Sequence, residues 1–142
     1  MKTDGNIKNI VVAAIRRHSM DLDTWAGTRL WEAGDPERMN ELSRQSELVP
    51  DELPILYSYC DSRNWTFVTT RRIWSCNEGG VGSIALPDVE TYTLGNFKGY
   101  AGQRIERMAV TSRDGSVRQC PYETGKPSMG TIYAVQTLLQ LR

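Results

Sequence analysis

The stretch Asn64–Cys76 reads NWTFVTTRRIWSC and decides the fold. Its residues alternate, with Trp65 and Phe67 on one side of an extended chain and the residues that follow each of them on the other. Aromatic and β-branched side chains in this alternation are typical of a strand rather than a helix. The stretch therefore predicts a strand pair, and the same period of two continues through most of the chain that follows.

We predict seven strands and a C-terminal helix between residues 53 and 142. The expected strands are Ile55–Cys60, Asn64–Thr69, Arg72–Cys76, Val81–Leu86, Val89–Leu94, Arg104–Ser112 and Ser116–Tyr122. Turn signals separate them, and Asp114-Gly115 is the clearest of these. A helix is expected from Ser128 to the C-terminus, with Val135 in its apolar stripe. We therefore expect one antiparallel sheet, bent into a barrel and closed by this helix.

Residues 1–48 predict a helical extension in front of this domain. The apolar residues of Ile7–Ile15 follow the spacing of a helix with one buried face. A second helical stretch is expected at Leu22–Trp31. Asp35-Pro36 is typical of an N-cap followed by proline at the first helical position, which predicts a third helix to about Ser46. The chain is therefore expected to be an α+β protein, with helices at 1–48 and the strand domain at 53–142.

The four tryptophans divide into two pairs. Trp65 and Trp74 lie on neighbouring expected strands and should belong to the core. Trp25 and Trp31 either pack the N-terminal helices onto the strands or form an exposed aromatic anchor for a partner, because aromatic anchors dominate many protein interfaces.

Two motifs resemble those of bacterial pleckstrin-homology-like domains. Residues Phe67–Trp74, FVTTRRIW, are similar to their strand–turn–strand, which often reads apolar-apolar-Thr-x-x-Arg-apolar-apolar. Residues Ile84–Val89, IALPDV, resemble the next strand, where an apolar-Pro-x-x-apolar stretch bends the chain. With the late Asp-Gly hairpin and the C-terminal helix, the likeness covers Leu53–Arg142. It implies a bent, partly open seven-stranded barrel, plugged at one end by the helix, that displays a binding surface.

The composition disfavours several classes of protein. The chain has 142 residues and a formal net charge of zero, whereas a nucleic-acid-binding protein usually carries a basic excess. We expect no signal peptide and no transmembrane helix, and therefore a cytoplasmic protein. Its three cysteines, Cys60, Cys76 and Cys120, are far apart and form no Cys-x-x-Cys pair. They predict free thiols, with no disulfide framework, zinc site or other metal cofactor.

No catalytic constellation is evident along the chain. His18 is the single histidine, and it follows two arginines at an expected helix end without an acid or nucleophile nearby. Asp21 and Asp23 could in principle hold a divalent cation, but acids beside a helix start are more often caps. We therefore expect a protein that is not an enzyme and needs no cofactor. The catalytic alternative is a small enzyme that uses an acidic residue in a barrel pocket.

A peripheral membrane or lipid-binding module is the second alternative, because many pleckstrin-homology domains bind phosphoinositides. Those domains carry several basic residues around the first hairpin. Here the first hairpin turn supplies only Arg63, and Asp61 lies beside it. We therefore expect weak binding to anionic vesicles, since each basic residue near such a surface contributes only ~1 kcal/mol.

Exclusion and analogy favour a non-catalytic protein-binding module. Among small bacterial proteins of this shape, the leading hypothesis is an immunity protein that neutralises a cognate toxin by direct binding. A glycine-rich loop would supply aromatic and basic contacts, and two turns would supply carboxylates to a basic toxin cleft. The expected contact residues are Phe97, Lys98, Tyr100, Asp61 and Glu78. The alternative for the loop is that it merely packs across the mouth of the barrel.

Overall fold

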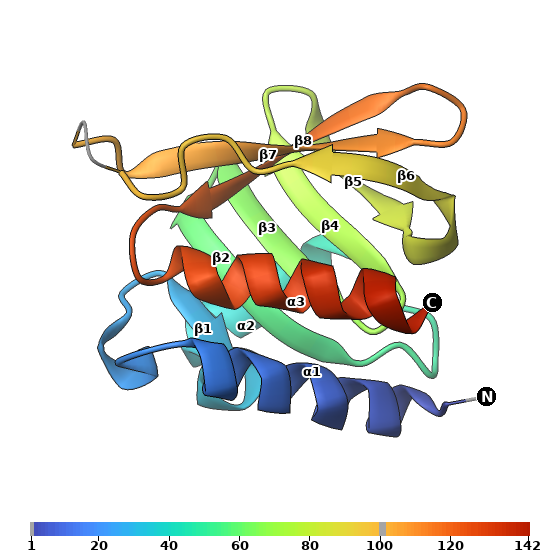
Figure 1. The fold of residues 1–142 in the computed structure, drawn as a ribbon, viewed down its shortest axis with the longest axis horizontal. Coiled ribbons are helices and arrows are strands. Elements are labelled where there is room, and N and C mark those ends of the chain that lie inside the picture. The colour runs from blue at the N-terminus through green and yellow to red at the C-terminus, as the bar shows by residue number, and fades with distance from the viewer. Residues whose placement is uncertain (1, 100–101) are drawn as a thin grey trace.

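The computed structural model describes residues 2–99 and 102–142, which form an α+β fold with three α-helices and eight strands (Figure 1). The helices are α1 (Asp4–His18), α2 (Pro36–Gln45) and α3 (Ser128–Leu141). The strands of sheet A are, in spatial order, β1 (Thr28–Leu30), β2 (Pro54–Asp61), β3 (Asn64–Thr69), β4 (Arg72–Asn77) and β5 (Gly80–Ala85). The strands of sheet B are β6 (Val89–Thr93), β7 (Ile105–Ser112) and β8 (Val117–Glu123). Every strand pair in both sheets is antiparallel.

Local sequence sets the helix starts. Thr3 Oγ1 accepts a hydrogen bond from the amide of Asn6 (3.1 Å) at the start of α1. The Asp35 carboxylate accepts one from the amide of Glu37 (3.2 Å) at the start of α2, and Pro36 fills the first turn. The predicted cap at Asp35 is therefore confirmed. Within the described ranges, no helix has the length and apolar character needed to cross a bilayer.

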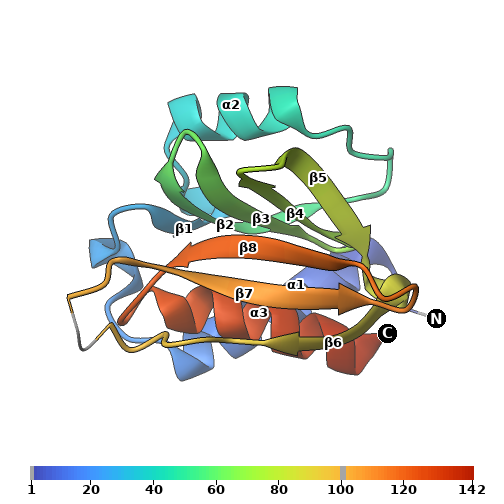
Figure 2. The ribbon, with the colours of Figure 1, turned by 90° about the horizontal axis from the view of Figure 1, so that it is seen from above.

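Sheet A is covered on both faces. Figure 2 shows α2 on one side of it, and sheet B with α1 and α3 on the other. α1 and α3 pack against each other along their lengths, and α3 also contacts β2 (Figure 1). The helices nearest the two ends of the chain are therefore neighbours in space.

One face of sheet A forms the main core. Leu56, Val68 and Ile73 are direct cross-strand neighbours on β2, β3 and β4, and all three are fully buried. Val11 and Ile15 of α1 belong to the same cluster, together with residues of α3 and of sheet B. The main core is therefore shared by both sheets and by the helices at both ends of the chain.

The opposite face of sheet A is aromatic. Tyr57, Phe67 and Trp74 are direct neighbours on β2, β3 and β4, and Trp65 lies beside them. α2 covers this cluster with the fully buried Leu42. The prediction that Trp65 and Trp74 are core residues is confirmed. The ring of the half-buried Trp31 stacks at 5.1 Å on that of Phe67, so this tryptophan packs onto the sheet.

Small hydroxyl side chains cross the inner face of sheet A. They are direct neighbours on β1 to β4 and are all fully buried, and we call them the hydroxyl row: Thr28, Ser58, Thr66 and Ser75. Gly82 continues the row on β5. A Cβ atom at Gly82 would lie 2.7 Å from Nη1 of Arg118, so a side chain at this position would require the Arg118 guanidinium to shift.

β8 lies across the hydroxyl row and joins the two sheets (Figure 1). The amide of Glu123 donates a hydrogen bond to Ser58 Oγ (2.9 Å) on β2. Thr66 Oγ1 donates to the carbonyl of Pro121 (2.6 Å) from β3. Nε of Arg118 donates to Ser75 Oγ (2.6 Å) on β4, and the Glu123 carboxylate accepts a bond from Thr28 on β1. Side-chain hydroxyls thus satisfy buried polar groups where β8 crosses sheet A.

The prediction of a helix over Leu22–Trp31 is wrong. This segment contains the short 3₁₀ turn η1 (Leu22–Thr24), the strand β1 and a second 3₁₀ turn, η2 (Trp31–Ala33). The carbonyl of Gly27 accepts a hydrogen bond from the amide of Tyr59 (2.8 Å), and the strand itself pairs with β2. Trp25 is buried, with 3% of its surface exposed. Pairing with β2 and the burial of alternate residues of β1 outweigh the helical propensity of this segment. A short helix is only marginally stable by itself.

The prediction of seven strands in one sheet also needs correction, because the structure has eight described strands in two sheets. β1 is the additional strand. After β5 the chain turns through a third 3₁₀ turn, η3 (Leu86–Asp88), where Pro87 has no amide hydrogen to donate to a ladder. The strands that follow pair with one another. The predicted start of the C-terminal helix at Ser128 is confirmed.

Candidate functional site

Asp61 and Glu78 lie at the same end of sheet A, because the β2–β3 and β4–β5 turns close this end of antiparallel strands. We call residues 61–64 and 77–80 the turn end. The exposed Asp61 carboxylate accepts hydrogen bonds from the amide of Arg63 (2.8 Å) and from Nδ2 of Asn64 (3.0 Å). These bonds hold the pKa of Asp61 below its usual value. Asp61 is therefore a fixed negative charge at neutral pH.

Glu78 borders a hollow beside the β4–β5 turn. The hollow has a volume of about 480 Å³, and its wall includes Arg107 and Val117. Val117 is 56% exposed, so the wall of the hollow combines an apolar surface residue with the opposite charges of Glu78 and Arg107. Nη2 of Arg107 donates a hydrogen bond to Asn64 Oδ1 (3.2 Å), which links this hollow to the turn that carries Asp61.

The β6–β7 loop carries the other predicted contact residues. Phe97 is half-buried and packs against the main core, and its carbonyl accepts a hydrogen bond from the amide of Gly125 (2.7 Å) just before α3. Lys98 is exposed. Tyr100 lies outside the described residues. Phe97 is thus attached to the body of the molecule and does not extend freely into solvent.

Glu106 holds this loop in place. Its carboxylate accepts hydrogen bonds from the amide of Asn96 (2.8 Å), from the amide of Arg107 (2.7 Å) and from Nε2 of Gln103 (3.3 Å). Burial works against ionisation, but the backbone amides outweigh it and lower the pKa of Glu106. The loop conformation therefore depends on an ionised Glu106.

The potential nucleophiles are protected by the fold. Burial, aided by the nearby Glu123 and Asp61, raises the pKa of Cys60 to about 12. Burial also raises the pKa of Cys120 to about 11 and that of Cys76 above its ordinary value. At neutral pH these thiols are protonated, and protonated thiols are poor nucleophiles and poor metal ligands.

Two of the titratable residues considered in the N-terminal region, His18 and Asp21, have structural partners. The ring of His18 stacks on that of Tyr133 at 4.3 Å, where α1 packs against α3. Asp21 pairs with Nζ of Lys126 (2.8 Å). In the part of the chain that the structure describes, no cluster of three His, Cys, Asp or Glu residues is arranged to hold a metal ion.

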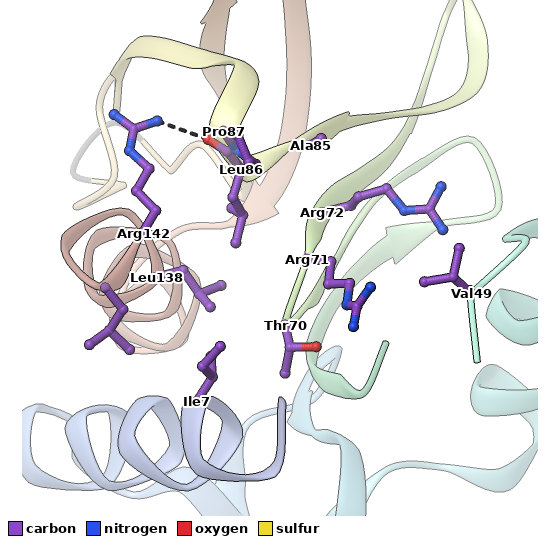
Figure 3. Close-up of a pocket in the computed structure, with 11 residues that line it drawn as sticks. Ile7, Val49, Thr70, Arg71, Arg72, Ala85, Leu86, Pro87, Leu138 and Arg142 are labelled. Carbon is purple, nitrogen blue, oxygen red and sulfur yellow. Dashed lines mark hydrogen bonds between the residues drawn. The ribbon is translucent and has the colours of Figure 1, made fainter. Parts of the chain in front are cut away.

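An apolar cavity opens at the end of sheet A opposite the turn end. It has a volume of about 490 Å³. Its apolar walls come from α1, η3 and α3, and include Ile7, Leu86, Leu138 and Leu141. Figure 3 shows Ile7, Leu86 and Leu138 directed toward a common space, with Thr70 and Arg71 of the β3–β4 turn on the facing side. The cavity is an opening into the main core, to which Leu86 and Leu138 belong.

Arginine side chains surround this cavity. Arg71 donates from Nε and Nη2 to the two oxygens of Asp4 (3.0 and 2.9 Å), a bidentate pair that attaches the start of α1 to the β3–β4 turn. Its Nη2 also lies 3.7 Å from Oδ2 of Asp51, whose side chain is 80% exposed. Nη1 of Arg142 donates to the carbonyls of Leu86 (2.8 Å) and Val89 (2.5 Å).

Glu52 is a buried carboxylate near the same end of the sheet. It accepts hydrogen bonds from Thr69 Oγ1 (2.5 Å), Trp74 Nε1 (3.2 Å) and Nη2 of Arg72 (2.5 Å), and its side chain is fully buried. Burial raises the pKa of Glu52, but these bonds outweigh it and the net pKa is lowered. Glu52 therefore ties the loop before β2 to β3 and β4.

No match to this chain is found among protein-family models, curated proteins or solved structures. The functional regions are therefore defined by geometry. The turn end combines Asp61, Glu78 and an exposed valine, and the opposite end holds the apolar cavity.

Sequence reasoning missed the cavity and its rim. Leu86 and Leu138 were apolar positions in an expected strand and helix, and nothing in their spacing indicates that a space would remain between them. A weak signal was available, because the pair Arg71-Arg72 follows a buried strand while acids occupy positions 4, 51 and 52.

Proposed function

We propose that this chain is a pleckstrin-homology-like, non-catalytic binding module of the cytoplasm, and that it is an immunity protein that neutralises a cognate toxin by direct binding. The observation that carries this proposal is the hollow at the turn end, whose wall combines the exposed Val117 with the charged residues Glu78 and Arg107. An apolar centre with a charged rim is the usual anatomy of a protein interface.

The charges of the turn end support specific recognition. The ionised Asp61 is held by its own turn, so its position is fixed before a partner arrives. Arg107 is bonded to Asn64 of the β2–β3 turn and lines the hollow that Glu78 borders. A rigid pattern of mixed charges favours a fast and selective encounter with a complementary surface. The carboxylates suit a basic cleft, such as one that a toxin uses for an anionic substrate.

The chemistry-bearing side chains support binding over catalysis. The thiols have raised pKa values, and the carboxylates of Glu52 and Glu106 are occupied by structural hydrogen bonds. The pairing of Arg71 with Asp4, and of Arg72 with Glu52, weighs against the membrane alternative. Asp4 holds Arg71 through two hydrogen bonds and Glu52 holds Arg72, so neither arginine is an unpaired cation available to a membrane surface.

Charge reversal at the turn end tests the proposal. The purified chain would be titrated with the products of adjacent genes, and any complex would be characterised by surface plasmon resonance. Glu78→Lys should lower the association rate about tenfold or more and reverse its salt dependence, because like charges oppose the encounter. The matched control is Glu47→Lys, since Glu47 is also an exposed glutamate but lies near Arg72, at the other end of sheet A.

The variants also separate the two predicted surfaces. Phe97→Ala and Lys98→Glu should weaken binding only if the β6–β7 loop extends the interface. Equal effects of Glu78→Lys and Glu47→Lys would remove the turn end from the interface. Failure of every neighbouring gene product to bind would remove the immunity function itself.

A further inference from the structure

The apolar cavity described above has no assigned occupant. Its walls come from segments far apart in the sequence, and all of the apolar side chains that line it in the described structure are aliphatic. Protein interiors are otherwise close-packed, with few voids larger than a water molecule. An aliphatic opening of this size at the edge of the main core suits an apolar ligand.

We propose that this cavity binds an aliphatic carboxylate of the fatty-acid class. The hydrocarbon chain lies among Leu86, Leu138 and Leu141, and the carboxylate pairs with the guanidinium of Arg71 at the rim. This site is distinct from the turn end proposed for a protein partner, because the β3–β4 turn and the β4–β5 turn close opposite ends of sheet A. It holds or fails independently of the immunity function.

The size of the cavity fits this class of ligand. Its volume of about 490 Å³ lies within the ~300–1,000 Å³ range of small-molecule sites. A flexible chain can follow a space bounded by α1, η3 and α3, and each methylene that it buries displaces water from aliphatic surface.

The rim selects an acidic head group. Arg71 keeps one strong partner, Asp4, which positions its guanidinium at the cavity. Its second acid, Asp51, is 3.7 Å away and 80% exposed, so this contact is weak and a ligand carboxylate can replace it. Arg142 lies across the cavity, where Figure 3 shows its side chain extending past Leu86. Its guanidinium donates hydrogen bonds to two backbone carbonyls. These acceptors are uncharged, so they do not neutralise the positive charge of Arg142.

The experiment is titration of the isolated chain with sodium decanoate and with decan-1-ol by calorimetry. Saturable 1:1 binding of decanoate is expected, at least about tenfold tighter than that of the alcohol, because a hydrogen-bonded charge pair is lost in the alcohol. Across hexanoate, octanoate and decanoate, affinity should rise about fourfold per methylene.

Two leucines of α3 give a matched pair for the walls. Leu141 lines the cavity, whereas Leu139 lies outside its lining, and both are half-buried on the same helix. Leu141→Gln should weaken decanoate binding about tenfold, because it places an amide among aliphatic groups. Leu139→Gln should leave the affinity nearly unchanged. Thermal unfolding of each variant confirms that it is folded.

Two substitutions test the head group. Arg71→Gln should abolish the preference for decanoate over decanol. Because Arg71 also attaches α1, Asp51→Asn provides a second test at an exposed side chain with little structural role. Asp51→Asn should strengthen decanoate binding two- to threefold, which corresponds to roughly the free energy of one exposed ion pair. It should leave decanol binding unchanged.

Each contrary outcome would overturn the proposal. Absence of saturable binding would do so, as would equal affinity for acid and alcohol that Asp51→Asn does not change. Binding to phosphatidylglycerol vesicles without free fatty acid, lost in Leu141→Gln, would assign the cavity to a membrane lipid instead. Loss of protein-partner binding in Leu141→Gln, with no decanoate binding, would assign it to a side chain of the partner.

Discussion

At the scale of single residues, Glu52 shows how hydrogen bonds compensate the desolvation of a buried charge. Its carboxylate has three side-chain donors, from Thr69, Arg72 and Trp74, so its hydrogen-bonding capacity is largely satisfied. Arg72 also stacks over the Trp74 ring at 4.4 Å from its centroid. Removing one partner of such a pair is costly, because the other partner remains buried without compensation.

Glu52→Gln should lower the free energy of unfolding by about 3 kcal/mol near neutral pH. The folded-state pKa of Glu52 lies below its ordinary value of 4.5, so its stabilisation is present above that value and is lost as the pH falls through the folded-state pKa. The difference between wild type and variant should therefore shrink in acid. Urea unfolding of wild type and variant, at neutral pH and at a pH below the ordinary pKa of a glutamate, measures this difference. The exposed Glu47→Gln should change stability by less than ~0.5 kcal/mol, and a loss for Glu52→Gln no larger than this would contradict the interpretation.

At the scale of elements, β1 marks the limit of sequence reasoning. The strands after Pro54 follow a period of two over several residues each, so their positions could be predicted. β1 has three residues, and Trp25, Leu30 and their neighbours also fit a helical spacing. What decides for a strand is pairing with β2, about 30 residues later in the chain, and such a non-local contact leaves little trace in a short window.

Gly27→Ala should prevent β1 from docking. A Cβ atom at Gly27 would lie 2.2 Å from the carbonyl oxygen of Tyr59, and backbone cannot yield as the end of a side chain can. We expect a loss of about 2 kcal/mol or more in the free energy of unfolding. Gly5→Ala is the control, because a Cβ atom there would lie 3.9 Å from Thr3 Oγ1, an ordinary contact distance, and helix α1 should gain ~0.5 kcal/mol. Equal stability of the two variants would show that the close approach at Gly27 is unimportant.

The candidate sites were predictable to different degrees. Turn chemistry at Asp61-Ser62-Arg63 and at the β4–β5 loop places Asp61 and Glu78 in turns, and alternate turns of a meander lie at one end of a sheet. The cavity could not be foreseen. The cavity exists because Ile7, Leu86 and Leu138 do not fill the space between them. Apolar periodicity predicts which residues face inward, but it does not predict how completely they fill the interior.

At the scale of the whole molecule, the main core connects segments that the sequence separates into a helical extension and a strand domain. Val11 and Ile15 of α1 and Leu30 of β1 lie in one cluster with Val135 of α3 and Val110 of sheet B. Each is buried to at least nine-tenths. Loss of such side chains typically costs 2–5 kcal/mol each, against a total stability of about 5–15 kcal/mol for a domain.

A fragment of residues 53–142 should therefore fail to fold by itself. It would lack the partner of β2 on one edge and the α1 side of the main core. We expect the full chain to unfold in one transition that coincides by far-ultraviolet circular dichroism and tryptophan fluorescence, and the fragment to show no cooperative transition. A fragment that unfolds cooperatively would establish residues 53–142 as an independent domain.

The hydroxyl row also bears on how the chain reaches this fold. β8 docks on Ser58, Thr66 and Ser75. These residues are direct neighbours only when β2, β3 and β4 are paired in the native register. A slip of β3 by one residue would turn Trp65 or Phe67 toward β8 in place of Thr66. There would then be no room for β8, and the buried carbonyl of Pro121 would lose its donor. Docking of β8 therefore disfavours a shifted register of sheet A, because only the native register presents a hydroxyl to the Pro121 carbonyl.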